Sequence, residues 1–155
     1  MEETRGRPDW EWAIVASHRA LVGEELCPAE DLFDYRGVVL CHDTSSDPLF
    51  VYANRTAQRL WRRSWEHFIG MPSRLTAPVQ ERAQRAAALH RNVVVRGYEG
   101  LRVDSGGRLF EIREATVWPV HEDGDVKLPI IGQAATFLQW EFRPEDQLGE
   151  RDHVV

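Results

Sequence analysis

The stretch Leu49–Leu75, LFVYANRTAQRLWRRSWEHFIGMPSRL, carries the clearest signal for the fold. Its first four residues are apolar and predict a short strand, and the residues that follow have the 3.6-residue period of an amphipathic helix. Asn54 stands between the two. Its side-chain oxygen can accept a hydrogen bond from an amide of the first helical turn, where backbone donors lack partners. The stretch therefore predicts a strand that enters a helix through an Asn cap. The apolar positions on one face of this helix are Ala57, Leu60 and Trp61.

The residues before this corner predict a helix, a helical turn and a strand. A helix from about Trp10 to Val22 is capped by Asp9 and ended by Gly23, since glycine commonly terminates helices. Residues 31–33 predict a short helical turn, and GVVLCH at 37–42 predicts the first strand. Residues 43–48 are rich in Asp, Ser and Pro, a composition typical of turns.

The residues after the corner predict two more helices and three long strands. The helices are expected at Ser64–Phe68 and from about Val79 to Arg91, and the strands at Val93–Val103, Arg108–Val120 and Ile130–Phe142. Within the second of these strands the apolar alternation changes phase at Arg113-Glu114, which indicates a β-bulge. Gly106-Gly107 fits a tight hairpin turn.

Three further motifs, PSRL at 72–75, RLFEIREATVW at 108–118 and GQAATF at 132–137, occur in order with the corner. Together they resemble the MEKHLA domain, a PAS-like family of small bacterial proteins and of C-terminal modules in plant class III homeodomain-zipper proteins. The resemblance covers roughly residues 26–142 and implies an α+β fold with a five-stranded antiparallel sheet in the order 2-1-5-4-3. Helices are expected on one face, preceded by an extra N-terminal helix. Cys41-His42-Asp43 departs from the family pattern, in which a Ser-His-Gly type turn follows the first strand.

The chain is expected to form one domain, because 155 residues with 43% hydrophobic content suit a single core. We assign residues 1–25 to a lead and helix, 26–142 to the PAS-like domain and 143–155 to a polar tail. No apolar run approaches the ~20 residues that span a bilayer, so we expect a cytoplasmic protein with no membrane partner. Two cysteines, Cys27 and Cys41, are too few for a disulfide framework and indicate buried thiols. The excess of 18 Arg over one Lys suggests a GC-rich bacterial genome.

The charges are unevenly distributed along the chain. The net charge is −6, which argues against binding to the nucleic-acid backbone. Residues 1–50 carry 4 basic and 11 acidic side chains, residues 51–113 carry 12 and 5, and residues 114–155 carry 3 and 9. These charges either interleave and neutralise one another on the folded surface, or form an anion-attracting face or complementary patches for self-association.

In a PAS-like fold a pocket lies between the inner sheet face and the helices at 54–91. Gln133, Ala135 and Phe137 share one strand face, which suits an apolar site with one polar contact. Gln133 can instead be exposed, with the alanines serving close helix packing. The other pocket candidates are Arg113, Arg74, Ser73, Trp61, Tyr52 and His90.

Each of these candidates also has a structural interpretation. Arg113 can pair with Glu111 or Glu114 on the outer face. Arg74 can bind a carboxylate or a phosphate, or it can tie its loop to the acidic segment around Asp31 or Asp34. The tryptophans can fill the core rather than stack on a ligand. His90 is the single haem-ligand candidate, and a core or surface histidine is the alternative. No metal-ligand spacing or catalytic motif is present, so we name no catalytic residue, metal or cofactor.

The sequence thus predicts a PAS-like module that senses a small molecule or signals, acting through a protein partner or as a homodimer. A ligand-free dimerisation or interaction module is the alternative, and a small enzyme built on a PAS-like shell is a third reading.

Overall fold

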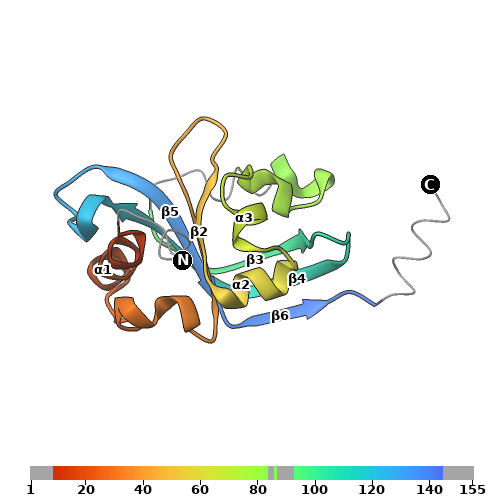
Figure 1. The fold of residues 1–155 in the computed structure, drawn as a ribbon, viewed down its shortest axis with the longest axis horizontal. Helices are drawn as coiled ribbons and strands as arrows, with labels where there is room; N and C mark the ends of the chain where they lie inside the picture. The colour runs from red at the N-terminus through yellow and green to blue at the C-terminus, as the bar shows by residue number, and fades with distance from the viewer. Residues whose placement is uncertain (1–8, 84–85, 87–92, 145–155) are drawn as a thin grey trace.

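The computed structural model describes residues 9–83, 86 and 93–144 (Figure 1). Its helices are α1 (Trp10–Val22), α2 (Arg55–Trp61) and α3 (Trp65–Phe68), and its 3₁₀ turns are η2 (Ala29–Asp34), η3 (Ser73–Thr76), η4 (Val79–Glu81) and η5 (Glu122–Gly124). Its strands are β1 (Val38–His42), β2 (Phe50–Ala53), β3 (Val95–Val103), β4 (Leu109–His121), β5 (Ile130–Phe137) and β6 (Gln139–Phe142).

The strands form one antiparallel sheet in the order β2-β1-β5-β4-β3, which confirms the predicted order. The sequence predicted five strands, and the sheet has six because the last one is interrupted at Leu138. Both parts of that strand pair with β4: Thr136 lies opposite Thr116, and Gln139 lies opposite Arg113. The interruption therefore falls beside residues 114–115 of β4.

That position on β4 is the predicted bulge. Tyr98 pairs with Ala115, whereas Gly100 pairs with Ile112, so β4 contains one residue more than β3 between the two pairs. Glu114 takes up the extra residue with a φ of 54°, a left-handed conformation that few non-glycine residues adopt. Because of the bulge, the inward side chains of β4 continue in register on both sides of residues 113–114.

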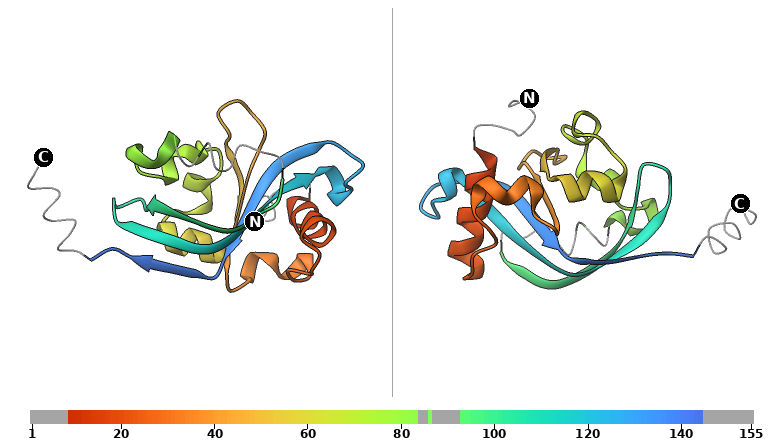
Figure 2. Two further views of the ribbon diagram at one scale, coloured as in Figure 1. Left: turned by 180° about the vertical axis from the view of Figure 1, so that it is seen from behind. Right: turned by 60° about the horizontal axis from the view of Figure 1, so that its bottom comes forward.

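The sheet carries a hydrophobic core on each face. Along β1, Val38 and Leu40 point to the face covered by α2 and α3, while Val39 and Cys41 point to the face covered by α1 and η2. Figure 2 shows these two groups of helices on opposite sides of the curved sheet. The predicted helices on one face and the extra N-terminal helix are both present, and the extra helix closes the second face.

Helix α1 is held on the sheet by buried apolar residues and by specific hydrogen bonds. The Asp9 side chain caps its first turn through the amide of Trp12, and Gly23 ends it with a φ of 95°. Ile14 and Val15 are almost fully buried. The indole Nε1–H of Trp118 donates to the carbonyl oxygen of Ile14, at 3.2 Å. The helix therefore covers the far side of β4.

Asn54 confirms the predicted cap and makes further contacts. Its Oδ1 accepts from the amide of Ala57 in α2 at 3.1 Å and from the amide of Val39 in β1 at 3.0 Å. Its Nδ2 donates to the carbonyl oxygens of Leu32, Tyr35 and Gly37, at 3.3, 3.3 and 2.9 Å. The side chain is fully buried, so it joins η2, β1 and α2 in the core.

The longest predicted helix, Val79 to Arg91, begins with η4 and continues through residues 82–83, and most of its remainder lies outside the described residues. No helix in the described part of the chain combines the length and apolarity needed to cross a bilayer.

His18 of α1 provides a test of the second core, which lies between the sheet and α1. Its ring is buried, meets Trp118 edge to face at 4.6 Å and donates from Nδ1 to the carbonyl oxygen of Glu24 at 2.8 Å. Burial lowers the pKa of His18 below its usual value, an effect that outweighs the opposing influence of Glu24 and Glu25, and Arg96 adds to the lowering. The folded state therefore favours the neutral ring.

Stability should consequently fall on acidification. Because the unfolded chain binds a proton to this histidine near pH 6.5 and the folded chain resists it, the stabilisation is complete above that pH and is lost as pH falls through the window below it. We expect urea unfolding midpoints measured from pH 7.5 to 5.5 to decline less steeply in His18→Gln than in the unmodified protein. The control is His67→Gln, which removes an exposed histidine. Equal slopes for His18→Gln and the unmodified protein would contradict the assignment.

Candidate functional site

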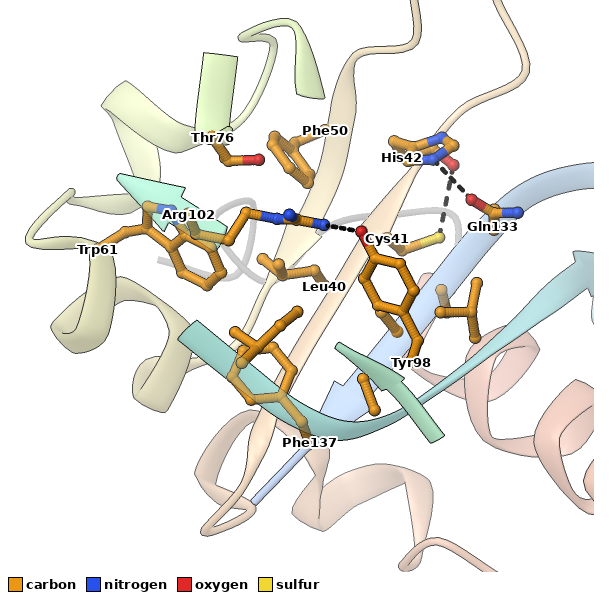
Figure 3. Close-up of a pocket in the computed structure, with 15 residues that line it drawn as sticks. Leu40, Cys41, His42, Phe50, Trp61, Thr76, Tyr98, Arg102, Gln133 and Phe137 are labelled. Carbon is orange, nitrogen blue, oxygen red and sulfur yellow. Dashed lines mark hydrogen bonds between the residues drawn. The ribbon is translucent and has the colours of Figure 1, made fainter. Parts of the chain in front are cut away.

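A small cavity of about 50 Å³ lies between the inner sheet face and the helices (Figure 3). Most of its walls are apolar, and a few polar side chains reach it from separate strands. Among the described residues the lining is Leu40, Cys41, His42, Phe50, Trp61, Thr76, Tyr98, Arg102, Ile112, Ala115, Val117, Gln133, Ala134, Ala135 and Phe137. The volume suits a few waters or a ligand of a few heavy atoms, and is well below the ~300–1,000 Å³ typical of drug-sized sites.

The strand face predicted from β5 is found in this cavity. Gln133, Ala135 and Phe137 all line it, as their period-two spacing requires. Gln133 is partly buried, and its Oε1 lies 3.1 Å from Nε2 of His42 on the neighbouring strand β1. Both residues also line an open groove outside the cavity, which places their hydrogen bond at the boundary between the two spaces.

The sequence analysis missed the most unusual residue of the cavity, Arg102 on β3. Its side chain is 5% exposed, and its guanidinium donates to the hydroxyl of Tyr98 at 2.9 Å and to the carbonyl oxygen of Leu101 at 2.8 Å. Figure 3 shows the guanidinium reaching across the cavity toward Tyr98. Among the described residues no carboxylate forms an ion pair with it. The signal that could have revealed it is the shared strand face of residues 98, 100 and 102.

Trp61 closes one end of the cavity as part of an aromatic core. Its ring meets those of Phe110, Phe68 and Phe137 at 5.1, 5.8 and 6.3 Å between centroids. The tryptophan is 1% exposed, and its indole N–H has no acceptor in the described part of the protein. Trp65 instead packs against Tyr52 in the other core. The two tryptophans therefore do not form one stacking platform.

The remaining candidates lie elsewhere. Tyr52 belongs to the second core, and its hydroxyl donates to Glu11 at 2.7 Å. Arg113 lies on the outer side of β4, where it pairs with Glu111 at 3.0 Å and Glu141 at 3.2 Å, as its structural interpretation predicted. His90 lies outside the described residues.

Ser73 and Arg74 line the open groove rather than the cavity. Arg74 pairs with Asp47 at 3.1 Å, which corrects the expected contact with the segment near Asp31. Ser73 is buried, and its amide donates to the carbonyl oxygen of Pro48 at 2.8 Å. These contacts tie the η3 loop to the loop before β2.

The two thiols are free and protonated at neutral pH. Burial raises the pKa of Cys41, whose side chain packs in the core under α1, and raises the pKa of Cys27 to about 11. Neither is an activated nucleophile. The described residues contain no group of three or more side chains able to hold a metal ion.

A second, open groove beside α2 gathers positive charge. Five arginines line it together with Asp34, Trp140 and Phe142, in a volume of about 600 Å³. Within the described part of the chain only Arg55 among them has an acidic partner, Asp34, at 2.8 Å. The basic middle of the sequence is therefore at least partly concentrated on one surface. The five arginines are Arg36, Arg55, Arg59, Arg62 and Arg108.

The antiparallel sheet order and the cavity between its inner face and the helices define a PAS-like domain, and solved structures agree. The PAS domain of a Colwellia psychrerythraea protein superposes with a TM-score of 0.58 at 13% identity, over 70% of this chain and 90% of that one. The photo-excited blue-light photoreceptor Vivid gives 0.56 at 17%, over 85% and 94%. The Rhodobacter sphaeroides LOV protein gives 0.51 at 18%, over 65% of this chain and 58% of that one.

Residues 9–142 match the MEKHLA domain model, so the chain belongs to the MEKHLA domain family. The match confirms the resemblance seen in the motifs and extends it to include α1. A comparison with curated proteins finds no match.

Proposed function

We propose that this chain is a sensory module that binds a small molecule in its inner cavity and signals through a partner protein. The observation that carries the proposal is the cavity lining, in which apolar walls surround polar groups from three different strands: His42, Arg102 and Gln133. Such a lining is typical of small-molecule sites. The membership of the PAS-like MEKHLA family supports the same role.

The sheet offers a route from the cavity to the opposite surface. Val117 lines the cavity, and the next residue, Trp118, points to the other face and bonds to the carbonyl oxygen of Ile14 in α1. A ligand that displaces β4 would therefore also displace the surface on which α1 packs. We propose α1 and its surroundings as the surface where a partner detects the bound state. The coupling rests on this packed contact between β4 and α1.

A ligand-free dimerisation module is the second candidate. The small cavity volume favours it, and so does the arginine-lined groove, because the first 50 and last 42 residues of the chain carry an excess of acidic side chains. Electrostatic pairing of these regions between two copies would weaken with added salt.

Native mass spectrometry separates the two candidates when it is combined with an absorption spectrum of protein purified without denaturant. A bound small molecule that is absent from Ala135→Leu, a variant that adds bulk to the cavity, supports the sensor. An empty protein that forms a salt-sensitive dimer supports the dimerisation module. An empty protein that remains monomeric with every cellular fraction tested would contradict both.

A further inference from the structure

We propose that the cavity binds a short-chain carboxylate and that Arg102 provides its counter-ion. The inference rests on the proposed function, since it takes the cavity to be a ligand site, and it adds the chemical class of the ligand. Three features of the described residues support it: the charge balance at Arg102, the glycine beneath its guanidinium, and the mixture of apolar and cationic walls.

The first feature is a buried cation with only neutral partners. Arginine stays protonated in proteins, and a buried charge is costly unless it is paired. Arg102 has a phenol oxygen and a backbone carbonyl oxygen as acceptors. The nearest acid along the strand, Asp104, is also buried. Its Oδ1 accepts from the amides of Gly106 and Arg108, and its Oδ2 has no hydrogen-bond partner in the described part of the protein. Within the described ranges, no carboxylate therefore forms an ion pair with the Arg102 guanidinium.

The second feature is Gly100, which lies between Tyr98 and Arg102 on the same strand face. A Cβ atom at this glycine would meet the Tyr98 hydroxyl at 2.7 Å and the Arg102 Nη1 at 2.8 Å. Its φ lies outside the left-handed region, so backbone conformation does not require glycine here. The missing side chain leaves space that the tyrosine hydroxyl and the guanidinium occupy together. The strand therefore places the Tyr98 hydroxyl and the Arg102 guanidinium side by side at the cavity.

The third feature is the combination of walls around the guanidinium. Leu40, Phe50, Ile112, Ala115 and Val117 line the same cavity. A guanidinium forms paired hydrogen bonds with a planar carboxylate, and the apolar walls suit a short alkyl group. A volume of about 50 Å³ limits the ligand to a few heavy atoms. Acetate and propionate have this size and this division between charge and hydrocarbon.

The test is a titration of the full chain with sodium acetate and sodium propionate against sodium chloride and sodium nitrate at equal ionic strength. The readouts are the amide NMR shifts of residues 98–102 and the melting temperature. We expect saturable shifts with the carboxylates, and at least tenfold weaker binding in Arg102→Met, which keeps an extended apolar side chain. The control is Arg74→Met, which removes an arginine outside the cavity and should bind as the unmodified protein does.

If Arg102→Met fails to fold, Gly100→Ala provides the second test, because the added methyl group displaces the guanidinium and should weaken carboxylate binding. Carboxylates that act no differently from chloride, or that bind Arg102→Met as tightly as the unmodified protein, would overturn the inference. Nitrate that binds as tightly as acetate would overturn the carboxylate assignment. A neutral copurified ligand without carboxylate binding would overturn the inference and leave the proposed function supported.

Discussion

Replacing Asn54 with alanine should lower the free energy of unfolding by roughly 3 to 5 kcal/mol, well above the ~1 kcal/mol of a typical lost helix cap. The reason is the number of buried groups that depend on this side chain. Two amides, of Val39 and Ala57, lose their acceptor, and the carbonyl oxygen of Gly37 loses a donor. The carbonyl oxygens of Leu32 and Tyr35 also lose a donor, but each keeps a second one, the Tyr35 amide and the Thr56 hydroxyl. A buried polar group left without a partner costs about 1 to 3 kcal/mol, and water entering the vacated space offsets part of the sum.

Asn54→Asp distinguishes the helix cap from the hydrogen bonds that Asn54 Nδ2 donates. Aspartate is as good a helix cap as asparagine, and it keeps the oxygen that accepts from the two amides. It removes the Nδ2 donor and places an oxygen opposite the carbonyls of η2 and the start of β1. We therefore expect Asn54→Asp to be at least as destabilised as Asn54→Ala.

Urea unfolding followed by circular dichroism measures both variants. Ser64→Ala is the matched control, because the hydroxyl of Ser64 caps α3 in an exposed position, where it contacts only the amide and the ring Nδ1 of His67 among the described residues. Its loss should cost about 1 kcal/mol or less. An Asn54→Asp protein as stable as the unmodified one would show that the three Nδ2 hydrogen bonds contribute nothing to stability.

The contacts of Asn54 also show which features can be predicted from the sequence and which depend on the tertiary fold. The strand, the helix and the cap follow from local patterns within a few residues. The three carbonyl groups belong to residues 17 to 22 positions earlier, and only the tertiary fold brings them to the side chain. The bulge at Glu114 was predictable because it changes a local alternation. The sheet order came from the family resemblance, since strand periodicity does not identify neighbours.

The cavity was partly predictable for the same reason. Period-two spacing placed Gln133 and Phe137 on its wall correctly. The sequence analysis missed Arg102 because arginine on a strand is usually exposed. Its burial depends on the residues that pack above it in the tertiary fold. Arg74 was expected to contact acids before β1 and instead pairs with Asp47, since charge patterns do not specify which loop folds over which.

Deleting residues 1–23 should abolish the cooperative unfolding transition or leave an aggregated protein. Ala13, Ile14, Val15 and Val22 of α1 are buried against the outer sheet face. At about 1.5 to 3 kcal/mol for each large apolar side chain, the three larger residues alone contribute roughly 5 to 9 kcal/mol. That amount is comparable with the 5 to 15 kcal/mol by which whole domains are stable. The helix therefore belongs to the folding unit.

The deletion would also uncover polar groups that the helix satisfies. The indole N–H of Trp118 loses the carbonyl oxygen of Ile14, and the amide of His121 loses the hydroxyl of Ser17, 2.9 Å away. Newly exposed apolar surface around Trp118 should then bind other copies of the chain. We expect the truncated protein to elute as large aggregates and to bind a hydrophobic dye.

Two further proteins show whether α1 completes the core or serves only self-association. A deletion of residues 1–8 leaves all of α1 in place and should melt like the full chain. Ile14→Ala keeps the helix and opens a space under it, and should cost about 2 to 5 kcal/mol at any protein concentration. A helix used only for association would instead give an Ile14→Ala protein whose stability loss grows on dilution. A 1–23 deletion that melts cooperatively near the full-chain temperature would show that the second core is dispensable.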